Sequence, residues 1–153
     1  MIEILKLAMT LKKNVCVYTC DSEISKFLYG RIIFIDNEFF ALYMLTPNGE
    51  NDGILVKKIS CITYVEMDGQ YDEKMKKLCP NFDDLISETS IDFENGNALF
   101  SIMLEALRTG KPISVELLDS GVDSVIGQVT AVNEKICTVR QIDEYGCDDG
   151  IAY

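Results

Sequence analysis

The stretch GRIIFID, residues Gly30 to Asp36, decides the fold because it places a glycine at the head of a run of β-branched and aromatic residues. Such residues favour β-strands. A glycine within a strand pattern usually marks a bulge, a sharp bend or a close approach of another backbone. The same arrangement returns 97 residues later as GQVTAVN, from Gly127 to Asn133. Two strands that bend at corresponding glycines predict two small sheets, each curved into a closed barrel.

The repeat continues into two acidic turns at the same offset, PNGENDG (Pro47 to Gly53) and EYGCDDG (Glu144 to Gly150). Asn, Asp and Gly are the residues that tight hairpin turns require sterically. Carboxylates so close together could also bind Ca²⁺, but calcium loops place their ligands at alternate positions and end in a bidentate Glu. The interpretation is therefore structural, and the assigned turn or bend residues are Gly30, Gly49, Asp52, Gly53, Gly127, Gly146, Asp149 and Gly150.

Each half of the chain has the same predicted order: helix, strand, turn, long strand pair, acidic turn, strand. Apolar residues at helical spacing predict a helix from Ile2 to about Lys12, and another from Asn97 to a stop at Gly110. Turn residues at 21–25 and 119–124 separate the first two strands of each half. The predicted organisation is a first repeat at 1–66, an acidic connector at 67–96 with helices near 72–78 and 83–88, and a second repeat at 97–153.

Composition bounds the class of protein. The chain has 153 residues, and its 48% hydrophobic content is enough to build a core, so we expect a folded, mainly β protein of the α+β class. No uninterrupted apolar run of about 18 residues exists, which predicts a cytoplasmic protein without a membrane partner. A net charge of −11 repels polyanions at long range. The six cysteines are expected to be reduced thiols.

Catalytic signatures are missing from the sequence. The chain has no histidine, which excludes Ser-His and Cys-His pairs. Zinc sites need closely spaced ligands, and the closest cysteine pair is Cys16 and Cys20, so we expect no structural zinc site. It has no phosphate-binding Gly-Lys loop and no Gly-x-Ser-x-Gly motif. We therefore expect a protein that is not an enzyme and that has no cofactor and no metal site.

Both repeats resemble the Sm-like (LSM) family of small bent barrels, in two tandem copies. The family's first motif is a glycine followed by apolar residues, an Asp and an Asn at fixed positions. Other five-stranded barrels, such as SH3-like ones, share much of this pattern. The matched positions are Gly30, Ile32, Ile35, Asp36, Phe39, Phe40 and Leu42 in the first copy, and Gly127, Val129, Val132, Asn133, Ile136, Cys137 and Val139 in the second.

The resemblance implies RNA binding, but two of the family's RNA-binding features differ here. Phe40 and Cys137 stand where the family has the Asn that contacts bases, and neither offers an amide to a base edge. The Arg-Gly pair of the second motif is absent from Leu55 to Ile62. The residues left as candidates for RNA binding are Asp36, Lys57 and Lys58.

The resemblance also implies assembly, because Sm-like proteins pair edge strands around a ring. Tyr153 aligns with Val56, so the second copy as written lacks a closing strand and is expected to offer an open edge. We therefore predict a non-catalytic binding or assembly module that acts through strand edges and barrel rims, as a homo-oligomer or with a protein partner. The alternative is a divergent RNA-binding Sm-like protein, and a third hypothesis is a metal-dependent enzyme that uses the acidic turns.

Overall fold

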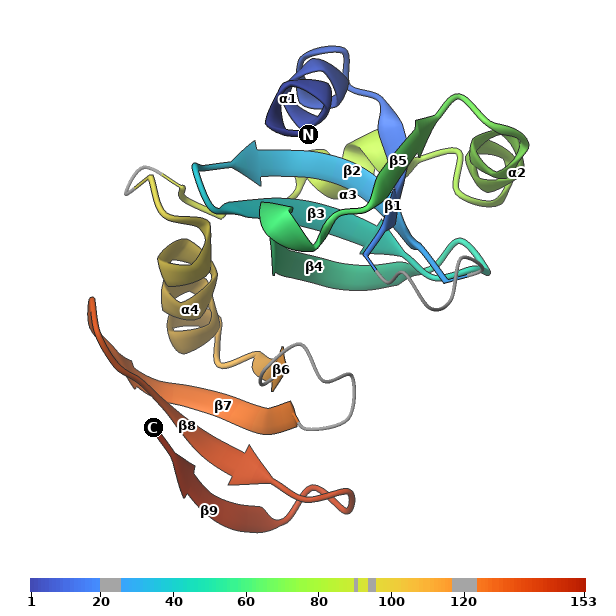
Figure 1. The fold of residues 1–153 in the computed structure, drawn as a ribbon. Helices are drawn as coiled ribbons and strands as arrows, with labels where there is room; N and C mark the ends of the chain where they lie inside the picture. The colour runs from blue at the N-terminus through green and yellow to red at the C-terminus, as the bar shows by residue number, and fades with distance from the viewer. Residues whose placement is uncertain (20–25, 90, 94–95, 117–123) are drawn as a thin grey trace. The chain divides into compact units, whose positions relative to one another are not determined.

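The protein has an α+β fold with two antiparallel sheets, seen in a computed structural model that describes residues 1–19, 26–89, 91–93, 96–116 and 124–153 (Figure 1). The predicted turns at 21–25 and 119–124 lie outside the described residues, apart from Ser124. The chain divides into two compact units, Met1–Ala98 and Leu99–Tyr153.

The first unit contains a five-stranded sheet in the order β4-β3-β2-β1-β5. A 3-10 turn, Ile59–Cys61, leads from β4 to β5. The remaining elements are α1 (Ile2–Thr10), β1 (Asn14–Tyr18), β2 (Leu28–Ile35), β3 (Phe39–Leu45), β4 (Asn51–Lys58), β5 (Tyr64–Met67), α2 (Gln70–Leu78) and α3 (Phe82–Ser87).

Strand alternation sends side chains to two cores, one on each face of this sheet. Val15 and Val17 of β1 join Leu5 and Ala8 of α1 in the first core. Cys16, between the two valines, points to the opposite face, because successive side chains of a strand alternate. That second core contains Tyr29, Tyr43 and Leu45 from the sheet, and Met75, Cys79 and Phe82 from α2, α3 and the residues between them. Helices α2 and α3 thus cover the face of the sheet opposite to α1.

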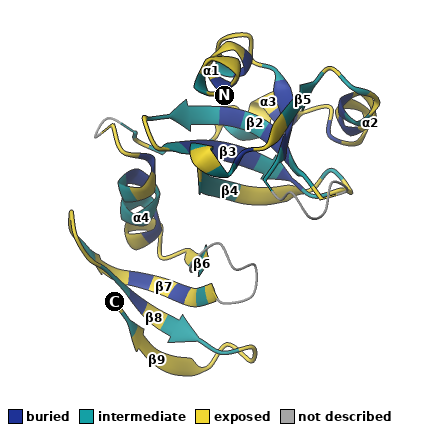
Figure 2. Cartoon of the chain, viewed as in Figure 1, coloured by how far each residue is buried: buried dark blue, intermediate teal, exposed yellow. Residues whose placement is uncertain are grey.

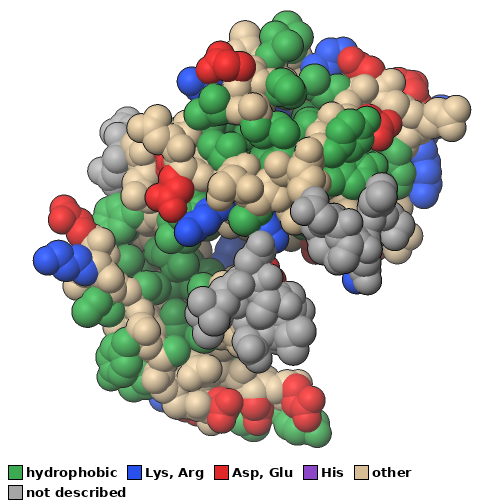
Figure 3. Space-filling model, viewed as in Figure 1, with side chains coloured by type: hydrophobic (Ala, Val, Ile, Leu, Met, Phe, Trp, Pro, Cys, Tyr) green, Lys and Arg blue, Asp and Glu red, His purple; other side chains and the backbone are tan. Residues whose placement is uncertain are grey.

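Helix α1 is apolar on more than its buried face. Leu5 and Ala8 are fully buried, whereas Ile4, Leu7 and Leu11 are exposed on the opposite side. Figure 3 shows hydrophobic side chains at the surface over α1. The predicted helix is therefore present, but only part of its apolar pattern contributes to the core.

The second unit contains a four-stranded sheet in the order β6-β7-β8-β9. Along β7 the burial alternates, with Gly127 and Val129 buried and Ile126, Gln128 and Thr130 exposed. One face of this sheet is thus solvated, and β9 is largely exposed (Figure 2). The elements are α4 (Ala98–Thr109, which starts at the boundary), β6 (Pro112–Glu116), β7 (Ser124–Val132), β8 (Cys137–Ile142) and β9 (Asp148–Ala152).

The two sheets share their pairing register. Gly30 pairs with Met44 in the first sheet, and Gly127 pairs with Gln141 in the second, so both partners are shifted by the same 97 positions. A bulge follows at the same offset in each sheet, between Ile32 and Phe34 and between Val129 and Ala131. A bulge bends its strand and increases the local twist, so both long strands bend just after their glycines.

Neither sheet closes into a barrel within the described residues. Strand β4 pairs with β3, and β5 pairs with β1, so these two strands are the edges of the first sheet. In the second sheet the end strands are β6 and β9. The bulges curve the sheets without bringing one edge into hydrogen-bonding contact with the other.

None of the helices in the described part of the chain has the length and apolar character needed to cross a membrane.

Candidate functional site

The two bend glycines lie where a neighbouring backbone comes very close. A Cβ added to Gly30 would lie 1.9 Å from the carbonyl oxygen of Tyr43, and one added to Gly127 would lie 2.0 Å from that of Arg140. Neither position leaves space for a side chain, because the obstacle in each case is backbone. Both glycines are therefore structural, and they occupy corresponding positions on their strand pairs.

The acidic turns use their polar groups to hold their own backbone. The Thr46 hydroxyl accepts hydrogen bonds from the N–H groups of Asn48 and Glu50, and one Asp143 carboxylate oxygen accepts those of Tyr145 and Cys147. Four glycines adopt the left-handed conformation that favours glycine, with φ of 83° at Gly49, 84° at Gly53, 78° at Gly146 and 100° at Gly150.

The strand that leaves each turn begins in the same way. The Asn51 side-chain oxygen accepts from the Gly53 N–H at 2.8 Å, and Asp148 accepts from Gly150 at 3.1 Å. The hydrogen bond from Gly150, with the ion pair to Arg140, lowers the pKa of Asp148. Asp52 and Asp149 are exposed. In the described part of the chain no three His, Cys, Asp or Glu side chains are grouped closely enough to hold a metal ion.

Asp36, one of the candidates for RNA binding, uses both carboxylate oxygens within the protein. Its Oδ1 accepts from the N–H groups of Glu38 (2.8 Å) and Phe39 (2.7 Å), and its Oδ2 accepts from Ala98 (2.8 Å). Burial alone would raise the pKa of Asp36, but these three hydrogen bonds outweigh it and lower the pKa. The carboxylate therefore acts as a turn-capping group.

Lys57 and Lys58 end strand β4 and pair with Phe40 and Phe39 of β3. As neighbours in a strand they point to opposite faces of the sheet. Lys58 lies 3.5 Å from the Glu38 carboxylate, in the turn that Asp36 holds. The structure thus brings Lys58 and Asp36 to the same end of the sheet, but it does not place both lysines on one basic surface.

A buried polar network joins β1 and β2 to α2, and the sequence analysis did not find it. The Asp72 carboxylate accepts hydrogen bonds from the Tyr29 hydroxyl (2.7 Å) and Asn14 Nδ2 (3.1 Å), and it pairs with Lys76 Nζ at 2.7 Å. Burial would raise the pKa of Asp72, but the hydrogen bonds from Lys76, Tyr29 and Asn14 together lower it. The i, i+4 spacing of Asp72 and Lys76 was the only indication of this network in the sequence.

Arg31 connects this network to α3. Its Nε and Nη2 donate to the Asn14 side-chain oxygen at 3.0 and 2.7 Å, and its Nη1 pairs with Asp83. The guanidinium lies 5.5 Å from the centre of the Phe82 ring. These contacts hold α3 against β2, and they are structural.

Five of the six cysteines lie in the described residues, and none of these five forms a disulfide. Burial, with the nearby carboxylates of Glu66 and Asp72, raises the pKa of Cys16 to about 12. Burial also raises the pKa of Cys79 and Cys137. Thiols with a raised pKa are poor nucleophiles at neutral pH. Cys147 differs from Cys16 and Cys79 in that its side chain is exposed to solvent.

Strand β9 is an exposed edge of the second sheet and pairs with β8 on one side. Ile151 in this strand is 59% exposed, and Tyr145 in the preceding turn is 82% exposed. Acidic side chains gather at that turn (Figure 3). A shallow hollow of about 480 Å³ lies beside the strand and is lined by Thr130, Arg140, Asp148, Gly150 and Ile151. Strand β9 therefore offers backbone hydrogen-bonding groups and apolar side chains together.

Comparison with known proteins assigns no family: no family model, no curated protein and no solved structure matches this chain.

Proposed function

We propose that the chain is a tandem of two Sm-like units that works as a non-catalytic assembly module, with β9 pairing along its free edge with a strand of a second copy. The observation that carries this proposal is the exposed edge strand β9, in which Ile151 lies open to solvent. The partner we favour is another copy of this chain, because each copy also has the edge strands β4 and β5.

The tandem interpretation is supported by structural details that two unrelated β-sheets would not share. Both sheets have the same bulge, the same close approach at a glycine and the same pair of left-handed turn glycines, all at one offset. The offset between the first strands of the two sheets is one residue larger than the offset between their second strands. Val15 pairs with Gly30 in the first sheet, and Ile113 pairs with Gly127 in the second. A one-residue insertion before the second strand accounts for this difference.

The assembly interpretation is supported by the second half of β9, Gly150 to Ala152, which contains no charged residue and no proline. Natural edge strands are commonly guarded by lysine, by proline or by an inward-pointing charge. Asp148 and Asp149 guard only the start of β9, and the residues that follow are Gly150, Ile151 and Ala152. Pairing with another strand would satisfy the outer backbone groups and cover Ile151.

The test is the mass in solution measured by light scattering after size exclusion, with one edge variant and one matched control. The whole chain is expected to run above its monomer mass of 17.2 kDa. Ile151→Lys adds a guarding charge to β9 and should lower the mass to that of the monomer.

Ile136→Lys is the control, because Ile136 is 52% exposed but lies in the turn between β7 and β8. It should leave the mass unchanged. A wild-type chain that stays at 17.2 kDa at every concentration would contradict the proposal, and so would an oligomer that Ile151→Lys leaves intact.

A further inference from the structure

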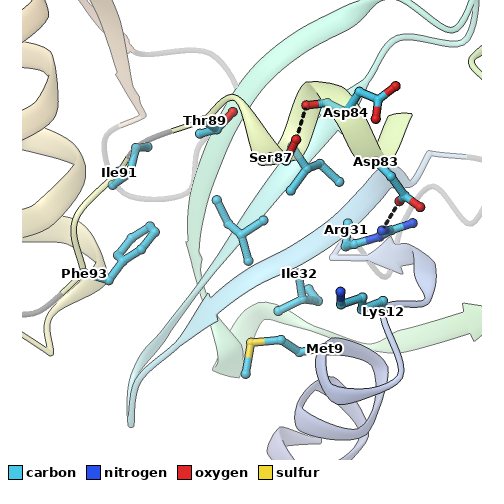
Figure 4. Close-up of a pocket in the computed structure, with 12 residues that line it drawn as sticks. Met9, Lys12, Arg31, Ile32, Asp83, Asp84, Ser87, Thr89, Ile91 and Phe93 are labelled. Carbon is cyan, nitrogen blue, oxygen red and sulfur yellow. Dashed lines mark hydrogen bonds and ion pairs between the residues drawn. The ribbon is translucent and has the colours of Figure 1, made fainter. Parts of the chain in front are cut away.

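The first unit has a cleft of about 610 Å³ that none of the features above explains. It lies between β2, helix α3 and the residues Thr89, Ile91 and Phe93, with the end of α1 at its rim (Figure 4). The Phe93 ring stacks on Phe34 of β2 at 4.4 Å between ring centres, which anchors the far wall. The apolar lining consists of Met9, Ile32, Ile33, Ile86, Ile91 and Phe93.

Most polar groups in the cleft are already engaged. Arg31 bonds Asn14 and pairs with Asp83. The hydroxyl of Ser87 donates to the Asp84 carbonyl at 2.8 Å, and that of Thr89 donates to the Leu85 carbonyl at 3.2 Å. These groups are therefore not available as the main contacts of a ligand.

Lys12 is the exception. Within the described ranges it is the one cation lining the cleft whose side chain makes neither a hydrogen bond nor an ion pair. Figure 4 shows its side chain on the same side as Arg31, reaching toward Ile32, with Ile91 and Phe93 across the cleft. The Asp84 carboxylate points away from this apolar wall (Figure 4). The cleft thus combines an apolar surface with one available positive charge.

We propose that this cleft binds a small amphipathic carboxylate, with its apolar part against the isoleucines and Phe93 and its carboxylate on the Lys12 ammonium group. The volume lies in the range of small-molecule sites, roughly 300–1,000 Å³, and such sites are mostly apolar with few polar anchors. A polyphosphate would need several donors, and the cleft offers one. This inference is independent of strand-edge assembly, because all lining residues belong to the first unit.

The experiment follows isoleucine methyl signals by NMR while octanoate is added to the full chain. Octanoate should shift the methyl signals of Ile33, Ile86 and Ile91 in a saturable way, with a Kd on the order of 1 mM for so small a ligand. The matched neutral probe is octan-1-ol, which keeps the apolar chain without the charge and should bind more weakly.

Lys12→Gln should weaken octanoate binding roughly tenfold, as expected for the loss of a hydrogen bond to a charged group. Lys6→Gln is the control, because Lys6 is an exposed lysine of α1 that does not line the cleft, and it should change nothing. Ser87→Trp adds a large ring at the rim and should abolish the shifts without depending on Lys12.

Several results would overturn the inference. One is the absence of shifts in the three cleft isoleucines, and another is shifts confined to Ile4 on the outer face of α1. Equal affinity of Lys12→Gln and wild type would remove the proposed anchor. Full binding by a folded Ser87→Trp variant would remove the cleft as the site.

Discussion

Replacing either bend glycine, Gly30 or Gly127, by alanine should destabilise its unit far more than replacing a glycine that has open space around it. In Gly30→Ala the new Cβ would lie 1.9 Å from the Tyr43 carbonyl oxygen and 2.9 Å from its carbonyl carbon. Because both atoms are backbone of the paired strand, no side-chain rotation relieves the clash. Strand β3 must move away from β2, and their hydrogen bonds must lengthen.

The size of the effect follows from three contributions. Forcing extra volume into packed structure costs about 1–3 kcal/mol. Each weakened ladder hydrogen bond adds about 1 kcal/mol. Alanine restricts the unfolded chain more than glycine does, which offsets roughly 0.4–1 kcal/mol. The net loss for Gly30→Ala is therefore about 3 kcal/mol, and Gly127→Ala should match it because its Cβ would lie 2.0 Å from the Arg140 oxygen.

The assay is urea unfolding followed by circular dichroism, with Gly53→Ala as the control. Gly53 has a left-handed φ of 84° but nothing within 4 Å of an added Cβ, so its replacement should cost only about 1 kcal/mol of backbone strain. If Gly30→Ala and Gly127→Ala cost no more than the control, the close approach of the backbones is not what these glycines provide.

Three further predictions concern the network, the thiols and RNA. Asp72→Asn should lower the free energy of unfolding by about 1–3 kcal/mol, because it removes the charge that three donors share. The pKa of Asp72 is lowered in the folded protein. Its contribution to the free energy of unfolding should therefore be complete above the ordinary carboxyl pKa of about 3.9 and be lost as the pH falls through the lower folded value. Thermal melts from neutral to acid pH check this, and an Asp72→Asn variant with the acid sensitivity of wild type would contradict it. At neutral pH a thiol reagent should modify Cys147 quickly and Cys16 very slowly, as read by peptide mass mapping, and equal rates would refute the assigned burial. Labelled oligo-uridine should show no binding even at low salt, because Asp36 is engaged and the net charge is −11; saturable binding that weakens with salt would restore the RNA-binding hypothesis.

The features that could be predicted from the sequence are local ones. The bend glycines, the acidic turns and the stop of the second helix at Gly110 follow from conformations that few other residues adopt. Gly110 indeed has a φ of 66°. The α+β class and the separation into strands follow from periodicity, which needs no knowledge of distant contacts.

The features that could not be predicted depend on pairs of residues far apart in the chain. The contact of Asn14 with Asp72 joins residues 58 positions apart, and nothing in the pattern around either residue indicates the other. The packing of Met75 and Phe82 on the first sheet, on the face opposite to α1, also depends on contacts between residues far apart in the chain. The cleft beside Lys12 arises only because α3 and Phe93 lie over β2.

The most direct test of strand-edge assembly is hydrogen exchange of β9 measured at several protein concentrations. If β9 pairs with a second copy, the amides within 148–152 that point away from β8 should exchange slowly in concentrated protein and quickly after dilution, while those of β7, held between β6 and β8, stay unchanged. Exchange of these outward-pointing amides that is equally fast at every concentration would contradict the proposed edge pairing.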